Sequence, residues 1–289
     1  MIDFQQIINT IYKDVFCNTY NQSCYIFLCG GADDNSIRDS VKNILTSRRF
    51  HILYPEDLFM EMLNRDKRSD LLEYENFLAD NSDIICIICE SMGSAVELGA
   101  FVQNEAIKKK LVVVINKKYS REKSFIMMGP IKHLRKSNDN SIVLYKSGEL
   151  LELCDKLSKQ FRKVKKNSVS NKNCSFDELT TYIAFLPVIL FFFKKIERKQ
   201  LHKELKIYLN NNNMLPSKYN ELFNATINYL LKTGIITTDF CHEKSEVLLS
   251  LSSKGYRETK KLLSNSCAKE KTILHDRIRC GIMKEQLNN

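Results

Sequence analysis

The sequence of 289 residues lacks a long hydrophobic run. The longest run extends from Ile183 to Phe193 and contains Pro187, so it is too short to span a bilayer, which takes about 20 apolar residues. The first turns of the chain contain Asp3, Lys13 and Asp14 and no continuous apolar core, so we expect no secretory leader. These absences predict a cytoplasmic protein that does not associate with membranes.

We also expect no signal that would direct the chain to an oxidising compartment, where disulfides form. Its ten cysteines therefore indicate free thiols in a reducing compartment. Cys86 and Cys89 have the spacing of some metal-binding and redox motifs, but they lie within a predicted strand. Side chains three positions apart on a strand point to opposite faces, so we expect no metal site there.

The excess of positive charge lies in the second half of the chain. Residues 1–150 contain 19 Lys and Arg against 20 Asp and Glu, a net charge of −1. Residues 151–289 contain 25 against 14, a net charge of +11. This asymmetry indicates two modules, the second of which faces an acidic partner such as nucleic acid. The alternative is a surface whose lysines only increase solubility.

The first half alternates between strands and helices. After an N-terminal helix within residues 1–20, short apolar runs predict strands at 24–29, 50–54, 83–89, 111–115 and 142–145. Helical patterns follow these strands at 36–48, 70–80, 95–108 and 148–162. The alternation predicts an α/β domain over residues 21–162, with a doubly wound parallel sheet of the Rossmann or flavodoxin-like type.

The second half changes to a helical pattern. Residues 163–175 are polar and basic, which predicts a linker. Helices are then expected at 176–196, 197–209 and 217–233, before two short strands and a helix that starts at Ser253 or Lys254. This order predicts a C-terminal winged helix-turn-helix domain over 176–265, followed by a polar tail over 266–289.

The strongest chemical signal is the stretch from Asp83 to Phe101. A buried strand runs into the turn Glu90-Ser91-Met92-Gly93-Ser94, and we expect Glu97 in the first turn of the helix that follows. Backbone N–H groups at such a helix start suit a phosphate. A carboxylate there would repel the phosphate, so it suits a sugar hydroxyl or a developing positive charge. The pattern indicates a ribosyl-transferring or N-glycosidic site; the alternative is a glutamate that only stabilises the helix dipole.

Two further turns are expected at the same edge of the sheet. Gly30 and Gly31 end the first strand and would let a ligand approach the backbone, unless they form a plain turn. Arg38 could reach a phosphate from the next helix or lie on its solvated face. The second strand ends at Tyr54-Pro55-Glu56-Asp57, where Glu56 and Asp57 could bind ribose hydroxyls. Asp57 could instead cap a helix.

Four motifs resemble the effector proteins of retrons, bacterial antiphage systems built from a reverse transcriptase, its RNA–DNA product and a toxin. The motifs are CYIFLCGG, HILYPEDLF, CESMGSAVELGAF and SFIMMGPIKHLRK, and they cover residues 25–136. The resemblance implies a nucleoside deoxyribosyltransferase-like domain that cleaves the N-glycosidic bond of NAD, followed by a winged helix. It also implies that the reverse transcriptase and its RNA–DNA hybrid hold the toxin inactive until phage infection. NAD would be the substrate, no cofactor is implied, and a higher-order assembly is compatible with such a complex.

The resemblance also assigns residues. Glu97 matches the family's catalytic glutamate, either as the nucleophile or as a group that positions the ribose. Gly129 and Pro130 match family positions of less clear role, and Met92 stands where some relatives have proline. The predicted substrate site comprises Gly30, Gly31, Arg38, Tyr54, Glu56, Asp57, Ser91, Gly93 and Ser94.

Basic residues of the second half could contact nucleic-acid phosphates. The best recognition-helix candidate, 219–233, has only Lys232 against Glu221, so we expect binding to backbone and shape rather than to bases. A winged helix that contacts only protein is the alternative. Two other functions stay open: a nucleotide-sensing DNA-binding regulator and a housekeeping ribosyltransferase. The predicted phosphate contacts are Lys194, Lys195, Arg198, Lys199, Lys254 and Arg257.

Overall fold

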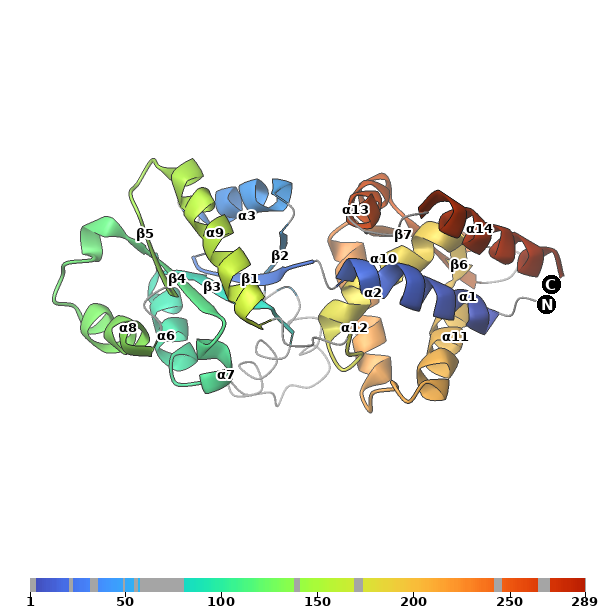
Figure 1. Cartoon of the computed structure of the whole chain (residues 1–289), viewed down its shortest axis with the longest axis horizontal. Coiled ribbons are helices and arrows are strands. Elements are labelled where there is room, and N and C mark those ends of the chain that lie inside the picture. Colours follow the sequence, from blue (N-terminus) through green and yellow to red (C-terminus); the bar gives the residue numbers. More distant parts are fainter. Residues whose placement is uncertain are drawn as a thin grey trace. The chain divides into compact units, whose positions relative to one another are not determined.

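The chain forms two compact units (Figure 1). The α/β unit is Cys24–Asn171, and the helical unit combines Met1–Ser23 with Lys172–Asn289. The structure is a computed structural model. It describes residues 4–20, 23–31, 36–48, 50–54, 57, 81–137, 141–168, 174–241, 246–264 and 271–288.

A five-stranded sheet forms the centre of the α/β unit, with the strand order β2-β1-β3-β4-β5. Every neighbouring pair is parallel, which confirms the predicted α/β fold of the Rossmann or flavodoxin-like type. β1, β3 and β4 are buried along their whole length, and this explains why they are continuous apolar runs in the sequence. The strands are β1 Tyr25–Cys29, β2 His51–Leu53, β3 Ile84–Ile88, β4 Leu111–Asn116 and β5 Ile142–Tyr145.

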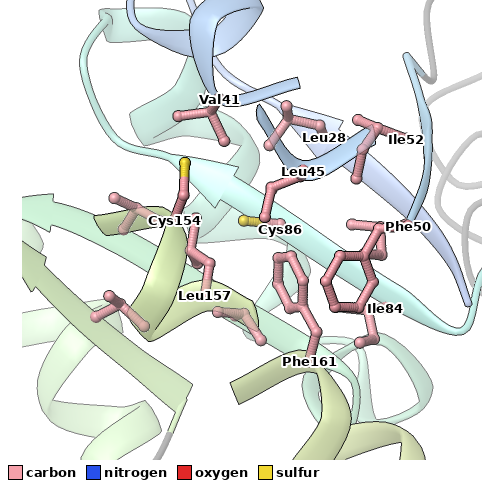
Figure 2. Packing of buried hydrophobic residues seen from close by; sticks show 14 of the residues in the cluster. Leu28, Val41, Leu45, Phe50, Ile52, Ile84, Cys86, Cys154, Leu157 and Phe161 are labelled. Carbon is pink, nitrogen blue, oxygen red and sulfur yellow. The ribbon is translucent and has the colours of Figure 1, made fainter. Parts of the chain in front are cut away.

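Helices cover both faces of this sheet (Figure 1). α3 (Arg38–Ser47) and α9 (Leu150–Ser168) pack together on one face, and α6 (Met92–Phe101) and α7 (Glu105–Lys108) lie on the other. Figure 2 shows side chains of α3 and α9, among them Leu45 and Phe161, packed over Leu28 and Cys86 of the strands. Shorter helical segments are η2 Lys117–Tyr119, η3 Met127–Ile131 and α8 Lys132–Ser137.

Two boundaries in this unit differ from those expected. α9 continues to Ser168, so the predicted linker from 163 starts as helix. The reason is that the buried face of α9 extends from Leu157 through Phe161 to Val164, at the spacing of one helix face. The helix predicted at 95–108 is divided into α6 and α7, because the side chain of Asn104 starts α7 by accepting from two backbone N–H groups. The helix predicted at 70–80 lies outside the described residues.

The helical unit joins the N-terminal helix to the second half of the chain. α1 (Phe4–Thr10), η1 (Ile11–Phe16) and α2 (Cys17–Tyr20) follow one another without a break. They pack on α10 (Leu179–Phe193), where the rings of Phe4 and Phe193 lie 4.9 Å apart and those of Phe16 and Phe185 4.7 Å apart. The helix predicted to precede the α/β domain is thus part of the other unit. It covers α10, all of whose residues are buried.

The expected polar tail contains a long helix, α14 (Lys271–Asn288). It packs against α1 and α10 and buries Ile278 and Ile282. The ring of His275 lies 5.1 Å from that of Phe192 in α10. α14 therefore packs onto the core of the helical unit through one face. None of the helices that the structure describes, the apolar α10 included, is long and apolar enough to cross a membrane.

The remaining elements follow one another in the order expected of a winged helix-turn-helix. The assignment of that fold, and of nucleic-acid binding to it, stays a prediction. α10 is followed by β6 (Lys195–Glu197), α11 (Arg198–Asn211) and α12 (Tyr219–Lys232). Then come β7 (Ile236–Cys241), β8 (Glu246–Leu251) and α13 (Ser253–Ser264), and the antiparallel sheet has the order β6-β8-β7. The sequence analysis did not predict β6, which separates the two helices predicted at 176–196 and 197–209. α10 ends at Phe193, and the next residue, Lys194, has a positive φ of 63°.

Gly255 in α13 lies against the backbone of Ile235, the residue before β7. A Cβ there would collide with the carbonyl oxygen of Ile235 and lie 2.8 Å from its carbon. We expect Gly255→Ala to lower the free energy of unfolding of the helical unit by about 1–3 kcal/mol, because backbone must move to admit the methyl group. Thermal unfolding followed by circular dichroism measures the change.

A matched control for Gly255→Ala is Gly99→Ala in α6. A Cβ at Gly99 meets nothing within 4 Å, so this change should be neutral or should stabilise by about 0.5–1 kcal/mol. Equal stability of the two variants would contradict the close contact at Gly255.

Candidate active site

A cavity of about 420 Å³ opens at the carboxyl edge of the parallel sheet. β2 and β3 pair with opposite sides of β1, so the strand order reverses between β1 and β3, and ligands of such sheets bind at the carboxyl ends of the strands at this point. The volume is that of a small-molecule site. Its described lining comprises Gly31, Ser36, Ile37, Cys89, Glu90, Ser91, Asn116, Lys118, Tyr119, Tyr145, Lys146, Ser147, Gly148 and Leu150.

The two glycines after β1 bring the first loop against the turn after β3. Gly30 has a φ of 155°, and a Cβ there would lie 3.2 Å from the carbonyl oxygen of Ile88. A Cβ on Gly31 would lie 3.6 Å from that of Ser91, and Gly31 itself lines the cavity. We expected these glycines to let a ligand approach the backbone. In the structure they let the loop after β1 approach the end of β3 and the turn that follows it, and Gly31 and Ser91 line one wall of the cavity.

Ser91 and Ser94 start α6 with reciprocal hydrogen bonds. The N–H of Ser94 donates to Ser91 Oγ at 3.2 Å, and the N–H of Ser91 donates to Ser94 Oγ at 3.0 Å. Both side chains are thus occupied in capping the helix. The N–H groups of Met92 and Gly93, which are exposed, are the donors left at this helix start.

Because of this cap, Glu97 lies later in the helix than the sequence predicted. Because α6 begins at Met92, Glu97 lies in the second turn and not in the first as predicted. Glu97 is half-buried and is not among the described residues that line the cavity. It lies close to Cys89, which does line it: burial and then the carboxylate of Glu97 raise the pKa of the Cys89 thiol to about 11. That thiol is protonated at neutral pH and is a poor nucleophile.

Glu90 is a site residue that the sequence analysis did not select. Its Oε1 accepts a hydrogen bond from the hydroxyl of Tyr145 at 2.6 Å, and its Oε2 accepts one from the N–H of Ile37 at 3.2 Å. Burial and the bond to Glu90 raise the pKa of Tyr145. Glu90 thus connects three walls of the cavity. The sequence signal that could have identified Glu90 is its position directly after the predicted buried strand 83–89, at the carboxyl edge of the sheet.

Arg38 and Tyr54 pack together behind the first loop. Arg38 is buried, donates to the carbonyl oxygen of Gly30 at 3.4 Å and lies 4.3 Å from the centre of the Tyr54 ring. The Tyr54 hydroxyl donates to Asp39. Neither residue is among the described lining of the cavity, so Arg38 supports the Gly30 loop and does not extend toward a phosphate there.

The other predicted residues of this site divide into three groups. Asp57 donates its N–H to the carbonyl oxygen of Tyr54 at 3.2 Å, which forms a turn after β2. Glu56 and Pro55 lie outside the described residues. Gly129 and Pro130 belong to η3 and are not among the described residues that line the cavity.

The predicted nucleic-acid contacts come from several elements, among them β6, α11 and α13. Lys195 in β6 forms an ion pair with Asp239 at 2.7 Å. Arg198 donates to Asn224 Oδ1 at 2.8 Å, and Lys254 donates to the carbonyl oxygen of Thr233 at 2.8 Å. These three cations therefore already have partners within the helical unit. Lys195 and Lys254 are nevertheless exposed, as are Lys194, Lys199 and Arg257, and Arg198 is half-buried.

Comparison with known proteins places this architecture in a family. The model of the family described as "STM3845 retron effector protein" matches residues 34–238. The chain is 40% identical over 154 residues to the "Retron Ec86 putative ribosyltransferase/DNA-binding protein" of Escherichia coli, covering 52% of this chain and 50% of the relative. It is 38% identical over 144 residues to the corresponding protein of retron Ec73 from the same organism, covering 46% and 45%.

The chain thus spans about half the length of the curated relatives that it matches. The family match extends across both units, from α3 to β7. It confirms the resemblance drawn from the four motifs, three of which lie wholly within the matched residues. On this match, the chain belongs to the STM3845 family of retron effector proteins.

Proposed function

We propose that this retron effector is an antiphage toxin whose α/β unit cleaves the bond between nicotinamide and ribose in NAD. The observation that carries the proposal is the cavity at the carboxyl ends of β1 and β3, which has Glu90 in its wall and is lined by Cys89, whose thiol the carboxylate of Glu97 influences. The relatives named as ribosyltransferases support a reaction at a ribosyl carbon.

The chemistry needs a carboxylate. When the glycosidic bond breaks, nicotinamide leaves as a neutral molecule with the bonding electrons, and positive charge develops on the ribose. Glu97 either stabilises that charge or attacks the anomeric carbon to form a glycosyl-enzyme, which water or another acceptor then resolves. Glu90, held by Tyr145 and Ile37, is placed to accept hydrogen bonds from ribose hydroxyls.

The helical unit docks on the retron complex in this proposal. The reverse transcriptase and its RNA–DNA product hold the toxin inactive, and phage infection releases it. The supporting features are the net charge of +6 on the helical unit, which has 20 Lys and Arg against 14 Asp and Glu, and the DNA-binding function in the names of the relatives. Phosphate contacts would supply most of the affinity.

The test is the NAD content of cells. In cells that carry the complete retron, we expect NAD to fall after phage infection and to stay constant without infection. Expression of the effector without its partners should lower NAD in the absence of phage. A constant NAD pool during effective defence would contradict cleavage of NAD and would indicate another substrate.

A further inference from the structure

A second hollow of about 490 Å³ adjoins the cavity at the ends of β4 and β5. The two share the lining residues Asn116, Lys118, Lys146 and Ser147, so they form one continuous depression. The second hollow adds Lys117 and Arg121. We call it the basic hollow.

The two parts of the depression differ in charge. The basic hollow is lined by Lys117, Lys118, Arg121 and Lys146, and no carboxylate belongs to its described lining. All four cations are exposed, and Lys146 also contacts the carboxylate of Glu149 at 3.1 Å. The adjoining cavity contains the carboxylate of Glu90. One end of the depression therefore attracts anions, whereas the other attracts hydroxyl groups or cations.

The backbone beneath the basic hollow is fixed by Asn116. This residue pairs with Tyr145 across β4 and β5, and its side chain is almost fully buried. Its Nδ2 donates to Ser147 Oγ at 3.0 Å, and its Oδ1 accepts from the N–H of Lys118 at 3.1 Å. The loops that carry Lys118 and Lys146 are thus held together before any ligand binds, which lowers the entropic cost of binding.

We infer that the basic hollow binds the phosphate groups of a nucleotide whose ribose occupies the adjoining cavity. The α/β unit then selects phosphorylated nucleotides and rejects free nucleosides. The carboxylate of Glu90 fixes the orientation, because it repels phosphate and accepts from sugar hydroxyls. This inference rests on the proposed function for the ribose end only.

The test is binding to the full-length chain that carries Glu97→Gln, so that no ligand is consumed. The probes are ADP-ribose, inorganic pyrophosphate and the nucleoside nicotinamide riboside. We expect the double variant Lys118→Gln/Arg121→Gln to weaken binding of ADP-ribose by about tenfold or more and to reduce its salt dependence. Nicotinamide riboside should bind the parent far more weakly than ADP-ribose does, and the double variant should not alter that weak binding.

The matched control is Lys159→Gln/Lys163→Gln, which removes the same charge from exposed positions of α9. It should leave every affinity as it is. Equal affinity of the Lys118/Arg121 variant and its parent for ADP-ribose, or an equal loss in the control, would overturn the inference, as would failure of ADP-ribose and pyrophosphate to bind the parent. Binding that depends on Lys118 and Arg121 in a protein that never cleaves NAD would support the basic hollow and refute the proposed reaction.

Discussion

Replacing Glu97 with Gln is expected to lower the rate of NAD cleavage by about a hundredfold or more. The amide has nearly the shape of the carboxylate but carries no charge, so it can neither stabilise the ribosyl cation nor attack it. Because Glu97 is half-buried in the second turn of α6, the uncharged side chain fits the same space and the α/β unit should stay folded. Nicotinamide release by the triggered retron complex measures the rate, and circular dichroism checks the fold.

Two comparisons make this variant decisive. Glu105→Gln is the matched control, because Glu105 is an exposed glutamate of the same unit whose ion pair is with Lys108. It should keep full activity. Glu90→Gln should mainly raise the KM, because Glu90 is proposed to hold the ribose hydroxyls. Undiminished turnover in folded Glu97→Gln would remove Glu97 from the mechanism, and a loss confined to Glu90→Gln would transfer the catalytic role to Glu90.

The second large effect is expected in the helical unit. If its cations contact nucleic-acid phosphates, the affinity for the RNA–DNA product should fall steeply as salt rises. The structure directs the test to Lys194, Lys199 and Arg257, which are exposed, because Lys195, Arg198 and Lys254 form contacts within the unit. Changing these three to Gln should flatten the salt dependence by roughly one unit per lost contact. Binding measured over a salt series gives the slope.

A control with the same loss of charge separates local contacts from the general field of the protein. Lys132, Lys159 and Lys163 are exposed on the α/β unit, and changing all three to Gln should leave the slope nearly unchanged. An assembly that does not depend on salt, and that the Lys194, Lys199 and Arg257 changes do not affect, would favour a helical unit that binds protein alone.

The sheet was predictable because its strands are short and the central ones, β1, β3 and β4, are buried on both faces. Continuous apolar runs such as Ile84–Ile88 cannot form the polar face of an open antiparallel sheet, so they indicate parallel strands covered by helices. Parallel strands also bring their carboxyl ends to one edge. For this reason the sequence alone placed Gly31 and Ser91 at one site, and both line the cavity.

Other features depended on contacts that no local pattern reveals. The N-terminal helix belongs with α10, and the pairing of Phe16 with Phe185 joins residues far apart in the sequence. Arg38 resembles a phosphate ligand in sequence, but its guanidinium lies against Tyr54. The position of Glu97 within its helix depends on where α6 starts. The cap formed by Ser91 and Ser94 starts α6 at Met92, earlier than predicted, so Glu97 lies in the second turn. Helix ends are determined by such side-chain contacts more than by hydrophobic period.

The most direct test of ribosyl chemistry is to incubate the purified retron complex with NAD, add lysate of phage-infected cells, and quantify free nicotinamide. We predict one nicotinamide for each NAD consumed, with the ribosyl part recovered as ADP-ribose or on an acceptor. NAD that binds without turnover would contradict this reaction and indicate a nucleotide-sensing regulator. Preferred cleavage of nucleosides would equally contradict it and indicate a housekeeping ribosyltransferase.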